Sequence, residues 1–116
     1  MAMSTVTHSI INLLDVKIRN LNHSTPTVKS VYFQSETLNH LTQFATATFN
    51  KGDMVEEHSH QTMNELFYVE YGRLILEING KEDNIEKGSV FIVYAKSMHK
   101  LEFVEETKLI YFGIKE

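Results

Sequence analysis

Closely spaced turn signals divide most of this chain into short segments that favour β-strands. Asn79-Gly80 is a strong hairpin signal, because both positions tolerate a positive φ angle, and Gly52, Gly72 and Gly88 lie in or beside further turns. The segments between the turns are rich in β-branched and aromatic residues; they cover residues 28–33, 42–49, 66–71, 74–78, 89–94, 99–104 and 108–114. Seven or more short strands with frequent turns predict an all-β fold, an antiparallel sandwich or barrel.

The N-terminal region gives a weaker signal than the rest of the chain. Residues 1–9 are small and polar, and we expect a disordered tail there. The apolar positions of residues 10–21 fit both a helical period and strand alternation. We favour an extended arm over residues 10–27, which ends in a loop that contains Pro26, the only proline. A chain of 116 residues suits one compact domain, which we place at residues 10–116.

The composition limits the classes of partner and site. A net charge of −4 gives no general attraction to nucleic acid or to an anionic membrane, and no run approaches the roughly 18 apolar residues of a membrane span. The first residues lack the pattern of a signal peptide, so we expect a cytoplasmic protein. The chain has no cysteine, which excludes disulfides, thiolate metal sites and thiol nucleophiles. Histidine and carboxylate therefore remain as the metal ligands to expect.

Three histidines and one glutamate form a candidate site for a divalent transition metal. His58 and His60 are two residues apart, and in a strand such residues point to the same face with about 6.6–7 Å between their Cα atoms. Glu65 follows after four residues, enough for a turn into a neighbouring strand, and His99 belongs to another strand. Three imidazoles and one carboxylate suit Fe, Mn, Ni, Cu or Zn. In six-coordinate geometry they leave two positions open for a ligand or substrate.

The other histidines of the chain have no such partners. A His-x-His pair alone is weak evidence for a metal, because histidines on loops are usually solvated. We expect His8 and His23 on the surface, whereas His40 is a candidate for the rim of a pocket. In the four-residue set, by contrast, the ligand type, the strand context and the turn glycines agree, and this agreement favours a metal site.

The region around these ligands resembles the first signature of the cupin superfamily. Gly52, His58, His60, Glu65 and Gly72 stand at its fixed positions, separated by five, one, four and six residues. The resemblance covers about residues 40–114. It implies a small single-domain cupin of the conserved-barrel type, whose fold is an antiparallel, jelly-roll-like double-stranded β-helix with the metal near one mouth. It also implies a homodimer, paired through N-terminal strands or sheet faces.

The second cupin signature is matched only in part. Gly88 and His99 resemble its glycine and its histidine, so the resemblance gives His99 the fourth ligand position. Tyr94, Lys96 and Phe103 stand where the signature has proline, glycine and asparagine. None of the three is a metal ligand, so the expected ligand set is unchanged. The departures concern the turn before His99 and any function inferred from closer relatives.

Strand alternation predicts which side chains accompany the ligands into the interior. The expected neighbours are Phe67 and Val69 beside Glu65, Leu101 and Phe103 beside His99, and Met54 and Glu56 beside His58 and His60, with Phe33, Met63, Tyr94 and Phe112 as further candidates. The expected interior is mostly apolar, and Glu56 and Tyr94 are the candidate catalytic acid or base. No cluster of arginine or lysine lies next to the ligand set, which disfavours a phosphorylated substrate.

Two functions of different class fit these features. The first is a metal-dependent enzyme, of the oxygenase or the isomerase/cyclase type, that acts on a small, partly apolar molecule. The second is a non-catalytic module that binds a small ligand. A purely structural metal fits less well, because closed structural sites fill every coordination position with protein atoms. Within the cupins, Glu65 argues against the thiol dioxygenases, which use three histidines, and the ligand set argues against the metal-free sugar-nucleotide epimerases.

Overall fold

A computed structural model gives the structure of residues 18–20, 28–34 and 38–116. The expected disordered tail, residues 1–9, and most of the expected arm, residues 10–27, lie outside the described residues. Within the arm, β1 (Ile18–Asn20) pairs antiparallel with β2 (Val28–Gln34), so these three residues are extended rather than helical. No helix in the described part of the chain is long and apolar enough to cross a membrane.

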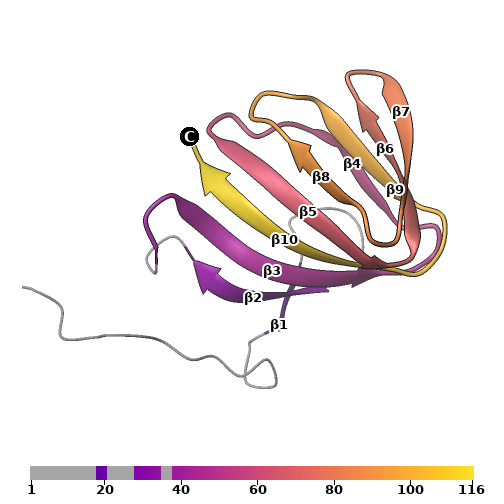
Figure 1. Ribbon diagram of the computed structural model, residues 1–116, viewed down its shortest axis with the longest axis horizontal. Coiled ribbons are helices and arrows are strands. Elements are labelled where there is room, and N and C mark those ends of the chain that lie inside the picture. The colour runs from indigo at the N-terminus through magenta and orange to yellow at the C-terminus, as the bar shows by residue number, and fades with distance from the viewer. Residues whose placement is uncertain (1–17, 21–27, 35–37) are drawn as a thin grey trace, which may run out of the picture.

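The described residues form two antiparallel sheets (Figure 1). A six-stranded sheet has the order β1-β2-β3-β10-β5-β8, and a four-stranded sheet has the order β4-β9-β6-β7. The remaining strands are β3 (Leu41–Phe49), β4 (Met54–His58), β5 (Met63–Tyr71), β6 (Arg73–Ile78), β7 (Lys81–Glu86), β8 (Val90–Val93), β9 (His99–Phe103) and β10 (Thr107–Lys115). The predicted all-β, antiparallel jelly-roll-like barrel is therefore confirmed.

Two of these strands are not among the segments predicted from the sequence. β4 is short and contains two adjacent glutamates, and β7 begins with the charged run from Lys81 to Asp83. β7 is an edge strand, and its side chains are exposed except for the half-buried Ile85. Edge strands commonly carry charged side chains, so β7 has no apolar alternation by which it could be recognised.

The hydrophobic core lies between the two sheets. Alternate residues of the facing strands bury their side chains there; they are Ala45, Ala47, Phe49, Val55, Phe67, Val69, Leu74, Leu76, Phe91, Val93, Leu101, Phe103, Leu109 and Tyr111. Phe49 of β3 stacks on Phe103 of β9 with 4.0 Å between the ring centroids, which joins the two sheets. The inward orientation predicted for Phe67, Val69, Leu101 and Phe103 agrees with their burial.

Residues with positive φ angles mark the turns that set this arrangement. Gly72 has a φ of +94° between β5 and β6, where the chain passes from one sheet to the other, and a Cβ atom there would collide with Thr107. Asn79 and Gly80 have φ angles of 48° and 86° and form the predicted turn between β6 and β7. Lys96 has a φ of 71°. This lysine adopts the left-handed conformation that glycine favours, at the position where the cupin signature has glycine.

Candidate metal site

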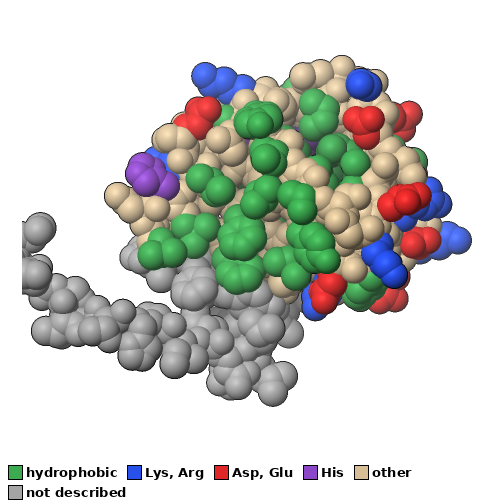
Figure 2. All heavy atoms as spheres, in the orientation of Figure 1, with side chains coloured by type: hydrophobic (Ala, Val, Ile, Leu, Met, Phe, Trp, Pro, Cys, Tyr) green, Lys and Arg blue, Asp and Glu red, His purple; other side chains and the backbone are tan. Residues whose placement is uncertain are grey.

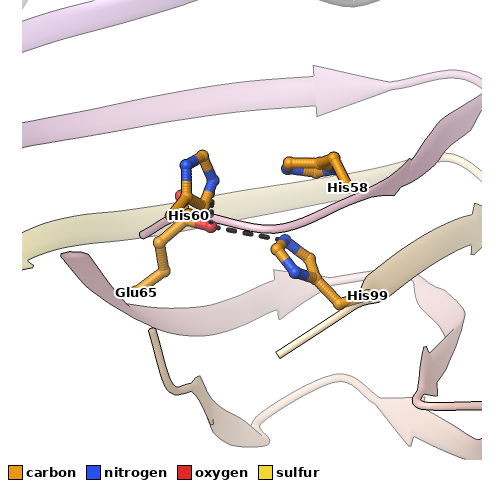
Figure 3. A group of neighbouring side chains, drawn as sticks. All are labelled: His58, His60, Glu65 and His99. Carbon is orange, nitrogen blue, oxygen red and sulfur yellow. Dashed lines mark ion pairs between the residues drawn. The ribbon is translucent and has the colours of Figure 1, made fainter. Parts of the chain in front are cut away.

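The four predicted ligands converge in the structure (Figure 3). His58 is the last residue of β4, His60 lies two residues beyond that strand, Glu65 belongs to β5, and His99 begins β9. One donor atom from each residue lies within 4.8 Å of the other three. Donor atoms held at about 2.1 Å from a single ion are about 3 to 4 Å apart. The structure therefore assembles a group that could hold a metal ion after a small contraction.

A bulge in β4 turns His58 toward the other ligands. Val55 pairs with Leu101 and His58 pairs with His99, so three steps along β4 match only two steps along β9. One extra residue in a strand changes the phase of its alternation, and Val55 and His58 consequently both line the interior. The expectation that Met54 and Glu56 share the face of His58 is therefore wrong, because both are exposed. His58 and His60 also do not share a strand, since β4 ends at His58.

Backbone carbonyls hold two of the imidazole rings in an orientation suited to a metal. The Nδ1 atom of His58 lies 2.8 Å from the carbonyl oxygen of Glu56, and Nδ1 of His99 lies 3.1 Å from that of Ser97. A carbonyl oxygen only accepts hydrogen bonds, so Nδ1 carries the proton in both rings. In the neutral rings, Nε2 then keeps the lone pair that binds a metal, an arrangement typical of metal-ligating histidine.

Glu65 is the acidic centre of the group. Its Oε1 atom lies 3.1 Å from Nε2 of His60 and 3.5 Å from Nε2 of His99. Burial would raise the pKa of Glu65, but the hydrogen bonds and charges of His60 and His99 outweigh burial and lower this pKa to about 2. The hydrogen bond to Glu65 in turn raises the pKa of His60. In the metal-free chain, a proton on His60 thus compensates the buried carboxylate, and a metal ion would replace that proton.

Backbone hydrogen bonds fix the loop that carries His60. The amide of Lys96 donates to the carbonyl oxygen of His60 at 2.6 Å, and the amide of Ala95 donates to Oδ1 of Asn64 at 2.8 Å. These bonds tie His60 and the start of β5 to the turn that precedes His99. Although its sequence departs from the cupin signature, that turn therefore still positions two of the four ligands.

A cavity of about 350 Å³ adjoins the four ligands. Besides the ligands, its lining residues are Thr42, Gln43, Phe49, Val55, Met63, Phe67, Leu101, Leu109 and Tyr111. This volume falls within the range of small-molecule sites, about 300–1,000 Å³. Among the described lining residues there is no arginine or lysine.

Several other candidate residues lie outside this cavity. Glu56 and Tyr94 are exposed and do not belong to its lining, so their predicted acid–base roles stay predictions that their positions do not support. His40 is exposed and is also not a lining residue. Phe112 stacks on Phe44 with centroids 4.6 Å apart and does not line the cavity. Of the further candidates, Met63 does line it, and the side chain of Phe33 lies outside the described atoms.

Sequence analysis did not single out Tyr111, Gln43 or Thr42, which contribute polar groups to the cavity wall. Alternation along β10 could have identified Tyr111, because Leu109 and Tyr111 are two residues apart and both face inward. Thr42 and Gln43 are adjacent in β3 and both line the cavity, so simple alternation does not predict them together.

A protein-family model described as the cupin domain matches residues 45–114. The chain is a cupin. The matched part contains all four ligand-type residues and seven of the nine other residues that line the cavity. No curated protein matches this cupin in sequence.

Solved structures with the same fold include proteins of several kinds. A predicted oxalate decarboxylase from Thermotoga maritima superposes with a TM-score of 0.82 and 18% identity, over 93% of this cupin and 100% of that chain. KdgF from Halomonas sp. superposes with a TM-score of 0.74 and 16% identity, over 93% of this cupin and 96% of that chain. The polyketide cyclase RemF from Streptomyces resistomycificus superposes with a TM-score of 0.74 and 13% identity, over 93% of this cupin and 79% of that chain. At these identities the likeness establishes the fold and no more.

Proposed function

We propose that this cupin binds a divalent transition metal through His58, His60, Glu65 and His99. The observation that carries the proposal is the convergence of four donor atoms within 4.8 Å beside a cavity. Three imidazoles and a carboxylate are borderline ligands, which suit Fe, Mn, Ni, Cu or Zn and do not select among them. Such an ion would supply Lewis acidity toward a substrate oxygen, or a site for dioxygen chemistry.

We further propose that the site belongs to a metal-dependent enzyme acting on a small, partly apolar molecule. The cavity supports this function, because Phe49, Val55, Phe67 and Leu101 give it apolar walls directly beside the ligand group. An oxygenase and an isomerase or cyclase are both compatible with these walls. One cupin of similar fold is named a polyketide cyclase and another a predicted decarboxylase, which illustrates the range of the fold. A cytoplasmic location stays a prediction.

The chain's own residues would perform defined tasks at such a site. His58 and His99 would present Nε2 atoms that the backbone has already oriented. Glu65 would reduce the charge of a divalent ion to a single positive charge. The buried walls would exclude water from the substrate, which strengthens electrostatic interactions inside the cavity.

Metal content of protein purified without a metal-binding tag tests the proposal. We expect about one equivalent of metal, lost on chelation and regained on adding zinc, and strongly reduced in His60→Asn. His40→Asn is a matched control, because it removes an exposed imidazole outside the ligand group and asparagine tolerates the φ of 70° at that position. If His60→Asn bound metal as tightly as His40→Asn, the proposed ligand set would be wrong. Metal and small-ligand binding without any turnover would favour the non-catalytic module.

We propose in addition that two copies of this cupin pair through the outer face of the six-stranded sheet. Figure 2 shows apolar side chains gathered over β8, β5, β10 and β3. Tyr68 lies opposite Val90 and Leu66 lies opposite Ile92, and Val90 is 60% exposed. A contiguous apolar patch of this kind commonly marks an interface, and a stable one buries about 800 Å² on each partner.

Light scattering of the purified protein tests this pairing. We expect a dimer for the wild type and a monomer for Ile92→Lys, because the substitution places a charge within the patch. Met54→Lys is the control, since Met54 is also exposed but lies on the four-stranded sheet. A monomeric wild type, or an Ile92→Lys variant that stays dimeric, would contradict the proposed interface.

A further inference from the structure

Among the described residues that line the cavity, Tyr111 is the one ionisable side chain that the proposed metal site does not use. It lies in β10 and is 6% exposed, and its ring stacks on Phe67 with 5.4 Å between the centroids. In the register of β10 and β5, Tyr111 pairs with Phe67 and Gly113 pairs with Glu65. Tyr111 and Glu65 are therefore diagonal neighbours on the inner face, a spacing that long side chains can bridge.

The hydroxyl group of Tyr111 borders the cavity as a hydrogen-bond donor. No hydrogen bond from it to a described residue is present, and no fully buried side-chain polar atom among the described residues lacks a partner. The hydroxyl therefore faces the open space of the cavity. Burial and the charge of Glu65 both raise the pKa of Tyr111, so the group keeps its proton at neutral pH.

We propose that Tyr111 donates a hydrogen bond to an oxygen of the molecule that the cavity takes up, and that this molecule is a phenol or an enol bound as its oxyanion. The inference rests on the proposed metal site. A buried phenolic hydroxyl aimed at a cavity is suited to this task, because a hydrogen bond to an ionised oxygen is shorter and stronger than one to a neutral oxygen.

The charge balance of the site favours a ligand with a single negative charge. A divalent ion together with the Glu65 carboxylate carries a net charge of +1, and the described lining residues include no lysine or arginine. A dianion or a phosphate ester would therefore leave excess negative charge in a partly buried site, which is costly. A phenol or enol that loses its proton to solvent brings one negative charge, and this matches the site.

The polarity of the walls favours a ligand with an apolar body. Phe49 and Phe67 line the cavity, and Phe67 lies between Phe91 and Tyr111, with centroid distances of 4.6 Å and 5.4 Å. Leu101 and Leu109 complete the apolar lining. Apolar walls of this kind suit the apolar body of a phenol or a conjugated enol. The oxygen of such a ligand would then lie toward the ligand group and the Tyr111 hydroxyl.

The probe for this inference is 4-nitrophenol, whose visible absorbance reports its ionisation. We expect the zinc-loaded protein to bind 4-nitrophenolate and to lower the pKa of the bound probe. Tyr111→Phe should weaken this binding roughly 10- to 100-fold, because it removes a hydrogen bond to an ionised oxygen, and it should raise the pKa of the bound probe. The variant keeps the ring that stacks on Phe67, so its thermal unfolding should stay near that of the wild type.

Matched controls separate this role from a structural one. Tyr71→Phe makes the same chemical change at an exposed position outside the cavity lining and should leave binding of the probe unchanged. The probe 4-nitroanisole has the same ring without an ionisable oxygen, so its weaker binding should not respond to Tyr111→Phe. Equal binding of 4-nitrophenol to wild type and Tyr111→Phe, or no binding to the zinc-loaded wild type, would overturn the inference.

Zinc titrations of the same proteins distinguish this failure from failure of the proposed function. If the wild type takes up zinc and Tyr111→Phe has no effect on the probe, the metal site stands and only the role of Tyr111 is wrong. If the wild type takes up no metal, the proposed function is wrong and this inference is overturned with it. Both proteins should bind zinc equally, because Tyr111 is not a ligand in the proposed site.

Discussion

The Glu65 carboxylate should make the stability of the metal-free protein depend on pH in a defined way. Its pKa is about 2 in the folded chain, against an ordinary value of 4.5. Because folding lowers this pKa, Glu65 stabilises the fold above pH 4.5 and loses that contribution as the pH falls toward 2. The difference between the two values corresponds to at most about 3 kcal/mol, and about 2 kcal/mol of it should be lost between pH 6 and pH 3.

Urea unfolding of the metal-free wild type, Glu65→Gln and Glu57→Gln between pH 6 and pH 3 measures this contribution. The pKa of His60 is raised, so its proton, and with it the ion pair, is retained in this range. The free-energy difference between wild type and Glu65→Gln should shrink by about 2 kcal/mol from pH 6 to pH 3. Glu57→Gln, a change at an exposed carboxylate, should follow the wild type. A difference that stays constant with pH would refute the electrostatic account of Glu65.

Above pH 6.5 the stability of the metal-free protein should fall as the pH rises, whereas the stability of the zinc-loaded protein should increase. The raised pKa of His60 stabilises the metal-free fold at low pH, and this effect is lost as the pH rises. Zinc replaces the proton on His60 and therefore binds better at high pH. Thermal unfolding with and without zinc measures how each stability changes with pH. Lys96→Gly should stabilise the fold by about 0.5–1 kcal/mol in urea, because it relieves a positive φ angle, and Lys96→Ala should not. Gly113→Ala should destabilise it by about 1–3 kcal/mol, because the added Cβ would meet Thr42 and Met63; a neutral result in urea would contradict that packing.

The spacing of His58, His60, Glu65 and His99 predicted the convergence of their side chains better than strand alternation predicted which residues face inward. His58, His60, Glu65 and His99 converge as expected, although only His58, Glu65 and His99 lie in strands. Turn positions were equally predictable, because Asn79-Gly80 needs positive φ angles that few other residues tolerate. These features depend on local chemistry, which a sequence displays directly.

Features that depend on the partner strand were not predictable. Alternation assumes a strict period of two, and the bulge between Val55 and His58 breaks that period without a glycine or proline to mark it. Met54 and Glu56 were consequently assigned to the wrong face. Tyr111 is an inward residue of a regular strand, but only the register with Phe67 places it beside Glu65 and the cavity.

The bulge also helps to explain why the His58 and His99 rings are oriented in the same way. His58 and His99 face each other across β4 and β9 with 4.1 Å between their ring centroids, and each ring contacts the carbonyl oxygen two residues before it. A regular ladder directs carbonyl oxygens toward the neighbouring strand, where they are not available to their own strand's side chains. The two carbonyl oxygens that the rings contact both belong to irregular backbone, the bulge before His58 and the turn before His99. The orientation of the imidazoles therefore depends on the departures from regular β-structure that the sequence reveals least.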